Sequence, residues 1–361
     1  MNHIPTPLTR REFLARTAAV PAICSVGATA AGVGPRAAAT ERIDCQSHLF
    51  CPELVALMEK RAGDPRVFRQ DGVRVVQMGD WLRKIPDHYL SVERKLATMD
   101  ANGIGLTALS INDPGPEWFG ADGPAIAQLV NDYIAGVVRQ HPTRFFGLCV
   151  LPTQDIRAAL AELDRCVQKL GFKGWLVYTN LAGRFPDEKQ FRPLFARAAE
   201  LDLPVLLHPA KPITIDFVKV YEMTSTLGNM FDNTIALTRL ILSGLLDEFP
   251  KLKLVCPHLG GTLPYIVGRL DHQVLVLKRG PKNLTRAPSE YLKQIWMDVV
   301  SPLPLAIKFG YDFIGGDRLL FSSDHPWVEP EVIIKCLEDA HLPADAHPGI
   351  FAGNARQLFG L

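Results

Sequence analysis

Residues Leu203–Pro209 read LPVLLHP, a short apolar strand that ends in a histidine. The same arrangement occurs three more times, in Arg42–His48 (RIDCQSH), Leu252–Gly261 (LKLVCPHLGG) and Arg318–Pro326 (RLLFSSDHP). The polar side chains that follow these strands are His48, His208, His258 and Asp324. Their successive separations of 160, 50 and 66 residues are too large for a local motif, so only the overall fold can bring them together.

The rest of the chain alternates short apolar runs with amphipathic stretches, which is typical of repeated βα units. Eight strands are predicted, at Arg42–Cys45, Gly105–Ser110, Phe145–Leu151, Gly174–Tyr178, Leu203–Leu207, Leu252–Cys256, Trp296–Val299 and Leu319–Phe321. Helical patterns lie between them, for example at Gly123–Gln140, Asp155–Leu170, Pro186–Asp202, Thr234–Phe249 and Glu290–Ile295. This alternation predicts an α/β fold, a TIM-type (β/α)₈ barrel. A doubly wound sheet would need a glycine-rich phosphate turn after its first strand, and that turn is absent.

The strands of a parallel barrel all end on one face, so the four polar side chains are expected to meet there. Neutral imidazoles and a carboxylate in that position are typical ligands of a catalytic divalent metal ion. A histidine on an apolar strand can instead be a core residue, and Asp324 can instead cap the loop that follows it. The strand-end position of all four residues favours the metal site and indicates an enzyme.

The segment from Met58 to Leu90 does not follow the alternation. Val67–Phe68 and Val73–Met78 flank the turn sequence Gln70-Asp71-Gly72, which predicts a small hairpin inserted after the first strand. Such an insertion either covers the mouth of the barrel and shapes the substrate pocket, or forms a surface elaboration or subunit contact. The predicted organisation is a leader at 1–39 and a barrel at 40–361, with residues 58–90 as an inserted hairpin or lid.

The first 39 residues are predicted to be an export signal of the twin-arginine type. Thr9-Arg10-Arg11-Glu12-Phe13-Leu14 resembles that signal, Thr17–Gly34 is weakly apolar, and Ala37-Ala38-Ala39 fits a cleavage site. The alternative is a cytosolic extension in which the paired arginines have no meaning. The stretch is too short and too rich in glycine and alanine for a stable membrane anchor. We therefore expect a periplasmic or exported protein.

The charge of the chain argues against a nucleic-acid partner. Its formal net charge is +1, and removing residues 1–39 leaves 35 basic and 37 acidic residues, a net charge of −2. No basic stripe remains that could follow a phosphate backbone. The six cysteines after residue 39 show no CxxC spacing and are expected to be free, although a disulfide between Cys45 and Cys51 stays open.

Several motifs, taken together and in this order, resemble the amidohydrolase-related decarboxylases, a family that includes aminocarboxymuconate-semialdehyde decarboxylase and γ-resorcylate decarboxylase. The motifs are Ile43-Asp44-x-x-Ser47-His48, Gly171-Phe172-Lys173-Gly174, Leu203-Pro204-Val205 through His208-Pro209, His258-Leu259-Gly260-Gly261, Gly268-Arg269, Ser323-Asp324-x-Pro326 and Gly353-Asn354-Ala355-Arg356. The resemblance implies a (β/α)₈ barrel with one Zn²⁺ or Mn²⁺ ion and no organic cofactor, and it suggests a homodimer. The fourth strand ends in Val177-Tyr178-Thr179-Asn180, without the lysine of two-metal amidohydrolases, so at most one ion is expected.

The resemblance also assigns roles to individual residues. His48, His208 and Asp324 are expected to hold the ion, and His258 to act beside it in proton transfer. Arg269 is expected to bind a substrate carboxylate; it is otherwise a surface ion-pair residue. The family's first strand usually ends in His-x-His or Glu-x-His, whereas this chain has Gln46-Ser47-His48. Gln46 either binds the ion weakly through its amide oxygen, or leaves it to the other ligands and solvent, or marks a barrel without metal.

Three functions follow. The first hypothesis is a metal-dependent, non-oxidative decarboxylase of an aromatic or unsaturated carboxylic acid, with a small-molecule carboxylic acid as substrate. The second is a metal-dependent hydrolase of an ester, lactone or amide, since the same ion can generate hydroxide. The third is a metal-free binding protein on the same scaffold, motivated by Gln46. His325, Trp327 and Lys211 lie on strand-end loops and are further candidates to line the pocket.

Overall fold

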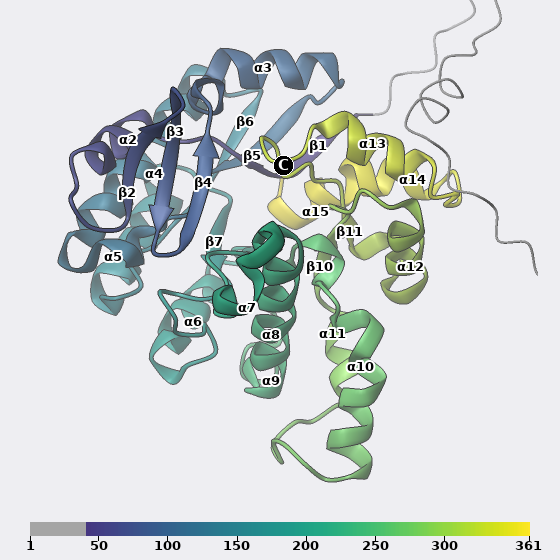
Figure 1. The fold of residues 1–361 in the computed structure, drawn as a ribbon. Helices are drawn as coiled ribbons and strands as arrows, with labels where there is room; N and C mark the ends of the chain where they lie inside the picture. The colour runs from purple at the N-terminus through teal and green to yellow at the C-terminus, as the bar shows by residue number, and fades with distance from the viewer. Residues whose placement is uncertain (1–40) are drawn as a thin grey trace, which may run out of the picture. The chain divides into compact units, whose positions relative to one another are not determined.

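Eight parallel strands form the central sheet of the computed structural model, which describes residues 41–361 (Figure 1). Their order in the sheet follows the chain, so each strand lies beside the next one. They are β1 (Ile43–His48), β5 (Leu106–Ser110), β6 (Phe145–Cys149), β7 (Gly174–Tyr178), β8 (Val205–His208), β9 (Leu254–Cys256), β10 (Trp296–Asp298) and β11 (Leu319–Leu320). The TIM-type barrel predicted from the sequence is confirmed, and all eight predicted strands are present; β7 has its predicted bounds and the other seven have different ends.

The barrel closes where β11 meets β1. The amide of Cys45 donates to the carbonyl of Phe321 at 3.0 Å, and the amide of His48 donates to that of His325 at 2.8 Å. In the other direction, the amide of Asp324 donates to the carbonyl of Gln46 at 2.9 Å. These bonds continue past the end of β11, so they place the loop with Asp324 directly beside the histidine end of β1.

The barrel strands are buried on both faces, with only Leu106 partly exposed. This pattern is typical of parallel strands, because helices cover the outer face and side chains fill the interior. Gly174, at the start of β7, shows how tightly the interior is filled: a Cβ there would lie 2.8 Å from Leu148 Cδ2 and 3.0 Å from Leu206 Cδ1. Only glycine fits between these two side chains.

Helices connect consecutive strands and form the outer layer (Figure 1). The α-helices of five or more residues are α2 (Pro52–Glu59), α3 (Val92–Ala101), α4 (Gly123–Gln140), α5 (Ile156–Gln168), α6 (Arg192–Glu200), α8 (Asn229–Leu242), α10 (Leu263–Asp271), α11 (Pro288–Leu292), α12 (Pro304–Ile314), α13 (Pro330–Glu338) and α15 (Asn354–Phe359). In α5, Asp155 caps the first turn by accepting from the amide of Ala158 at 3.0 Å. Ala159, Leu163 and Cys166 then form its buried face, at a helical spacing.

The segment inserted after α2 is a three-stranded antiparallel sheet of β2 (Arg66–Gln70), β3 (Val73–Met78) and β4 (Trp81–Ile85). Asp71 and Gly72 both have positive φ, which suits the two-residue turn between β2 and β3. The third strand, β4, was not identified from the sequence. Arg83 on β4 contacts Asn112 after β5, and Asp80 pairs with Lys219 after β8 at 2.8 Å, so the sheet lies at the rim where the barrel strands end.

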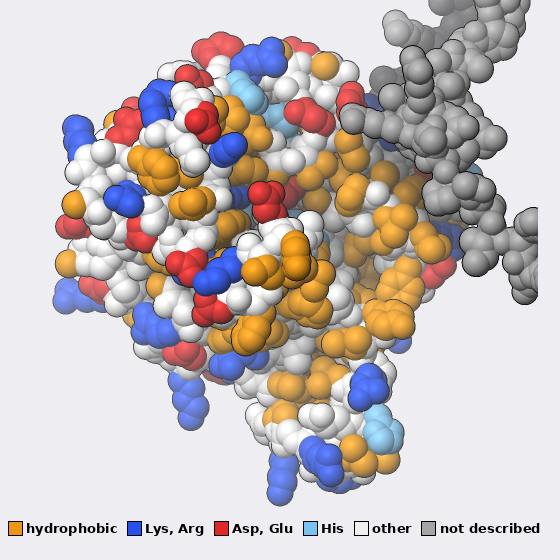
Figure 2. Space-filling model, viewed as in Figure 1, with side chains coloured by type: hydrophobic (Ala, Val, Ile, Leu, Met, Phe, Trp, Pro, Cys, Tyr) orange, Lys and Arg blue, Asp and Glu red, His pale blue; other side chains and the backbone are white. Residues whose placement is uncertain are grey.

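Large apolar side chains are exposed on part of the surface. They cluster in the short helices α7 (Ile215–Val218) and η4 (Val220–Glu222) and along α10 and the following η7 (His272–Val276), as Figure 2 shows. Within these four segments the most exposed are Phe217, Tyr221, Tyr265 and Val276, and Leu305 on α12 is exposed as well. Among residues 41–361, no helix combines the length and the apolar character needed to span a membrane.

Candidate metal centre

The barrel brings together the four strand-end residues predicted from the sequence. His48 and His208 are the last residues of β1 and β8, His258 follows β9 by two residues, and Asp324 lies in the loop after β11. His48 and His208 are almost fully buried, and 14% of the Asp324 side chain is exposed. Asp324 therefore offers the group a limited opening toward solvent.

Three of these residues present donor atoms to one point. Nε2 of His48 lies 3.1 Å from Oδ1 of Asp324 and 2.9 Å from Nε2 of His208, and the His208 and Asp324 atoms are 3.9 Å apart. All three donor atoms lie within 4.8 Å of one another. Two imidazole nitrogens and a carboxylate oxygen at these distances fit a single divalent transition-metal ion.

The outer nitrogens of both histidines are fixed by hydrogen bonds. Nδ1 of His208 lies 2.7 Å from the carbonyl of Pro209 and must donate to it, which leaves the lone pair on Nε2. Nδ1 of His48 lies 2.9 Å from the hydroxyl of Ser110, which is itself 3.5 Å from the carbonyl of Ser47. This chain of bonds also leaves the lone pair of His48 on Nε2, the tautomer that a metal ion requires.

The charges of the group also suit a metal ion. Burial and the neighbouring His208 lower the pKa of His48 to about 4, so this imidazole is neutral at pH 7. Burial alone would raise the pKa of Asp324, but the neighbouring imidazoles of His208, His258 and His48 hold it well below its usual range. A neutral imidazole and an ionised carboxylate are the forms that bind divalent ions.

Gln46 lies beside this group but is oriented by Asp324. Its side-chain amide nitrogen donates to Oδ1 of Asp324 at 3.1 Å, and the residue is almost fully buried. In this orientation the amide holds the carboxylate in place. Rotation of the amide by half a turn would present its oxygen to the same point, so the predicted role of Gln46 as a weak ligand stays a prediction.

His258 lies next to Asp324, on its other oxygen. Its Nε2 is 3.7 Å from Oδ2 of Asp324, while its Nδ1 is 2.9 Å from the amide nitrogen of Asn233. Burial alone would lower the pKa of His258, but Asp324 and the buried carboxylate of Asp298 raise it above its usual value. His258 and Asp324 both have positive φ, of 55° and 61°, a strained conformation that is typical of functional sites.

Arg269 is not brought into this group. It lies exposed in the last turn of α10, and it forms no ion pair within residues 41–361. Its predicted role in substrate binding stays a prediction. The three loop candidates are nearer: His325 follows Asp324 directly, Trp327 lies under Arg83 at 3.9 Å, and Lys211 lies close to Gly79 of the inserted sheet.

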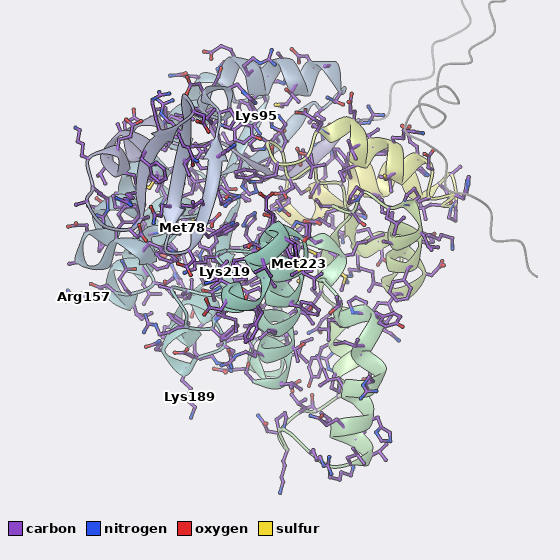
Figure 3. The ribbon with its side chains drawn as sticks, in the orientation of Figure 1. Met78, Lys95, Arg157, Lys189, Lys219 and Met223 are labelled. Atoms are coloured by element: carbon purple, nitrogen blue, oxygen red, sulfur yellow. The ribbon has the colours of Figure 1, made fainter. Side chains whose placement is uncertain are left out.

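A buried lysine supports the loop that carries Asp324 and was not identified from the sequence. This residue is Lys95 on α3 (Figure 3). Its Nζ lies 2.7 Å from Oγ of Ser47, 2.6 Å from Nδ1 of His325 and 3.1 Å from the carbonyl of His325. Burial lowers the pKa of Lys95 to about 7. Asp44, in β1, also holds this loop, because its carboxylate accepts hydrogen bonds from the amide and the hydroxyl of Ser323 at 2.9 and 2.6 Å.

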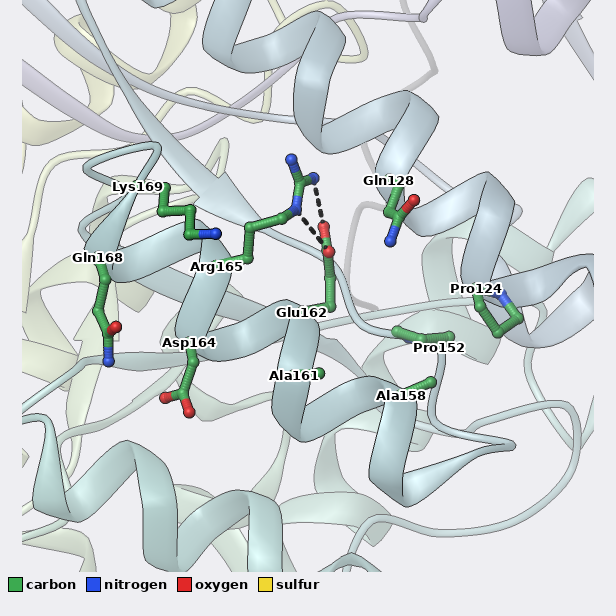
Figure 4. A pocket seen from close by; sticks show the side chains of 10 residues that line it. All are labelled: Pro124, Gln128, Pro152, Ala158, Ala161, Glu162, Asp164, Arg165, Gln168 and Lys169. Atoms are coloured by element: carbon green, nitrogen blue, oxygen red, sulfur yellow. Dashed lines mark hydrogen bonds and ion pairs between the residues drawn. The ribbon is translucent and has the colours of Figure 1, made fainter.

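The remaining sequence expectations concern residues outside the centre. Cys45 and Cys51 are both buried free thiols, so the possible disulfide between them is not formed. The leader predicted at residues 1–39 lies outside the described residues. A groove of about 370 Å³ lies on the outer face between α4 and α5, where Arg165 and Glu162 point toward each other (Figure 4). Glu162 is paired with Arg165 and Asp164 with Arg197, and the groove holds none of the strand-end residues, so it is not the site of the chemistry.

Comparisons with known proteins agree with this geometry. Residues 43–361 match the family model described as Amidohydrolase. The chain is 31% identical over 285 residues to the γ-resorcylate decarboxylase of Polaromonas sp. strain JS666, covering 74% of this chain and 87% of that protein. It is 26% identical over 297 residues to the 2-amino-3-carboxymuconate-6-semialdehyde decarboxylase of Dictyostelium discoideum, covering 78% and 80%. The crystal structure of a dihydroxybenzoic acid decarboxylase from Polaromonas sp. JS666, with bound manganese and the inhibitor 2-nitroresorcinol, aligns with a TM-score of 0.74 at 26% identity, covering 89% of this chain and 97% of that one.

Proposed function

Because the chain belongs to the amidohydrolase family, we propose that it is a metal-dependent, non-oxidative decarboxylase of an aromatic or unsaturated carboxylic acid. The observation that carries the proposal is the convergence of His48, His208 and Asp324 at one point of the barrel rim. The likeness to decarboxylases of aromatic acids supports it.

One divalent ion is proposed at His48, His208 and Asp324, with Gln46 as a further weak ligand. Manganese is the first choice, because a related structure contains it and because carboxylate and amide oxygens suit this ion; zinc is the alternative. When bound, the ion polarises the carboxylate or a neighbouring hydroxyl oxygen of the substrate. The chain itself orients both histidine ligands, because Pro209 fixes His208 and Ser110 fixes His48 through their Nδ1 atoms.

The reaction requires a proton on the carbon that bears the carboxylate. That carbon gains the proton, and the electron pair of its bond to the carboxylate returns to the substrate as CO₂ leaves. His258 is the proposed proton source, because its raised pKa keeps a proton on the imidazole next to the ionised Asp324. Asp324, with Oδ2 at 3.7 Å from Nε2 of His258, is placed to pass that proton to the carbon.

The inserted sheet is proposed to act as a lid over the substrate pocket. Arg83 on β4 stacks on Trp327 and donates to Oδ1 of Asn112 at 2.6 Å, which ties the sheet to two loops of the rim. Arg269 remains the proposed carboxylate-binding residue, and its exposed position on α10 places it on the surface with Tyr265.

A homodimer is proposed from the exposed apolar side chains of α7, η4, α10 and η7. Apolar patches of this kind often mark protein contacts. The measurement is the molar mass in solution by light scattering, where a mass of one chain would contradict the proposal. Residues 1–39 are proposed to direct export by the twin-arginine route, which is tested by fractionating cells that produce the chain with and without Arg10 and Arg11.

The activity is tested on purified protein supplemented with Mn²⁺ or Zn²⁺. Panels of hydroxybenzoates and of lactones are incubated with it, and release of CO₂ is followed alongside release of acid. CO₂ from a hydroxybenzoate supports the proposal, whereas turnover of lactones alone would establish the hydrolase instead. Elemental analysis of protein purified without chelator addresses the third hypothesis, because one equivalent of a transition metal contradicts a metal-free binding protein.

A further inference from the structure

Four buried polar side chains lie on the rim between β5 and β7 and have no part in the mechanism above. Asn112 and Asp113 follow β5, Glu117 lies in the turn η2 (Pro116–Asp122), and Tyr178 ends β7. Their exposed fractions are 2%, 1%, 9% and 2%. Within the described part of the chain, Nδ2 of Asn112, Oδ2 of Asp113, Oε1 of Glu117 and Oη of Tyr178 all lack a hydrogen-bond partner. Buried polar atoms are nearly always bonded, so four unbonded ones in one place indicate a ligand site.

Glu117 and Tyr178 pack against the same residue, Gly115. A Cβ on Gly115 would lie 2.3 Å from Cε2 of Tyr178 and 2.4 Å from Oε2 of Glu117, so the ring edge and the carboxyl group are neighbours across this glycine. Tyr178 pairs in the sheet with His208, and the two rings meet edge to face with centroids 6.1 Å apart. The pair of Glu117 and Tyr178 therefore lies one ring away from a proposed metal ligand.

The charged side chains around Glu117 and Tyr178 are already balanced. Arg83 pairs with Asp113 and donates to Asn112, and its guanidinium lies flat on Trp327. Burial raises the pKa of Glu117 to about 8, so this residue is mostly protonated at pH 7. Burial also raises the pKa of Tyr178 well above its usual value. Both groups are neutral, and each can donate and accept a hydrogen bond.

We propose that Glu117 and Tyr178 form a second subsite, which binds a ring hydroxyl group of the substrate on the side away from the metal centre. A hydroxyl both donates and accepts, so one group can satisfy the acid and the phenol together. A second carboxylate would meet Asp113 without a free counter-charge, and an apolar group would leave both atoms unbonded. The inference rests on the proposed function, because it assumes a hydroxylated aromatic acid as substrate.

The test measures binding of ligands that cannot lose CO₂. A nitro group replaces the carboxylate, and the Mn²⁺-loaded protein is titrated by calorimetry with 2-nitrophenol and with its analogues that carry a second hydroxyl: 3-nitrocatechol, 4-nitroresorcinol and nitrohydroquinone. One analogue is expected to bind about threefold to tenfold more tightly than 2-nitrophenol, the gain of one net hydrogen bond. In Tyr178→Phe and in Glu117→Gln this preference should fall below about twofold.

The matched control is Tyr133→Phe, a partly buried tyrosine on α4 that should retain the preference. If either test variant fails to fold, Gly115→Ala serves in its place, because its Cβ would displace both Tyr178 and Glu117. A preference that is absent from the unmodified protein, or unchanged in the folded variants, overturns the subsite. CO₂ release is measured separately. A preference for the second hydroxyl without any CO₂ release would refute the proposed decarboxylase and leave the subsite standing. CO₂ release without that preference would refute the subsite alone.

Discussion

The side-chain amide nitrogen of Asn233 lies 2.9 Å from Nδ1 of His258. An amide nitrogen can only donate, so in the neutral form of His258 Nδ1 accepts and Nε2 carries the proton; the imidazolium that supplies the proton in the proposed mechanism carries one on Nε2 as well. That atom faces Oδ2 of Asp324 at 3.7 Å. Asn233, fully buried on α8, thus selects the tautomer that points a proton toward the metal centre.

Asn233→Ala should therefore lower kcat about 10- to 100-fold, the usual cost of losing a hydrogen bond that orients a site residue. KM and manganese content should change little, because Asn233 touches neither the substrate nor a proposed ligand. Asn233→Asp should be more harmful, since a carboxylate accepts from Nδ1 and reverses the tautomer. Steady-state kinetics with metal analysis on the same preparations decide the matter, and equal kcat values in all three proteins would contradict the assignment.

Gln46→Glu should tighten Mn²⁺ binding at least tenfold. The variant adds a negative charge about 3.1 Å from Oδ1 of Asp324, where a cation relieves the repulsion. Without metal, the variant should melt at a lower temperature than the unmodified protein. Added Mn²⁺ should raise the Tm of the variant by more than it raises the Tm of the unmodified protein. Calorimetric titration and melting curves with and without chelator supply both values. Unchanged affinity would show that position 46 is remote from the ion.

His208→Ala should abolish both metal content and activity. It removes one of three donor atoms that share a point, and the remaining two hold divalent ions weakly. His341→Ala is the matched control, because this histidine is exposed and lies outside the site. Elemental analysis after purification in Mn²⁺ gives the result. One equivalent of metal in the His208 variant would refute its assignment as a ligand.

Much of the fold was predictable because strong local signals agree with it. Strand β7 (Gly174–Tyr178) and helix α4 (Gly123–Gln140) have their predicted bounds, since glycine or proline marks their ends and apolar residues set their period. The strand β4 was missed because WLRKI shows no clear alternation, and only its contact with the rim orders it.

The four strand-end residues were predictable for a topological reason, since parallel strands deliver their last residues to one face. Lys95 and Asn233 were not. Each is one of several polar residues in an amphipathic helix, where a polar residue ordinarily faces solvent, and only tertiary packing buries it. Asp44 gave the one usable signal, because a carboxylate inside an apolar strand requires partners, here Ser323.

Glu117 predicts a specific pH dependence of stability. Its pKa is about 8 in the folded protein and near 4.5 when exposed, so its contribution is fully present below pH 4.5 and is lost as the pH rises toward 8. Glu117→Gln should remove this loss. The Tm of the variant relative to the unmodified protein should therefore increase between pH 5 and pH 8, corresponding to roughly 1 kcal/mol per pH unit. A constant Tm difference over that range would contradict a protonated Glu117.

Lys95→Met should weaken the metal centre from a distance. Methionine has a similar length but no donor, so the variant leaves Oγ of Ser47 and Nδ1 of His325 without the bonds that hold the loop between His48 and Asp324. Loss of a buried donor of this kind costs about 1–3 kcal/mol of unfolding free energy. Manganese affinity should fall about tenfold, because the ligands are no longer held in register. Lys335→Met, at an exposed ion pair with Asp339, is the control and should change neither value. Were Lys95→Met to lose stability yet bind Mn²⁺ with full affinity, the lysine would support the barrel and not the site.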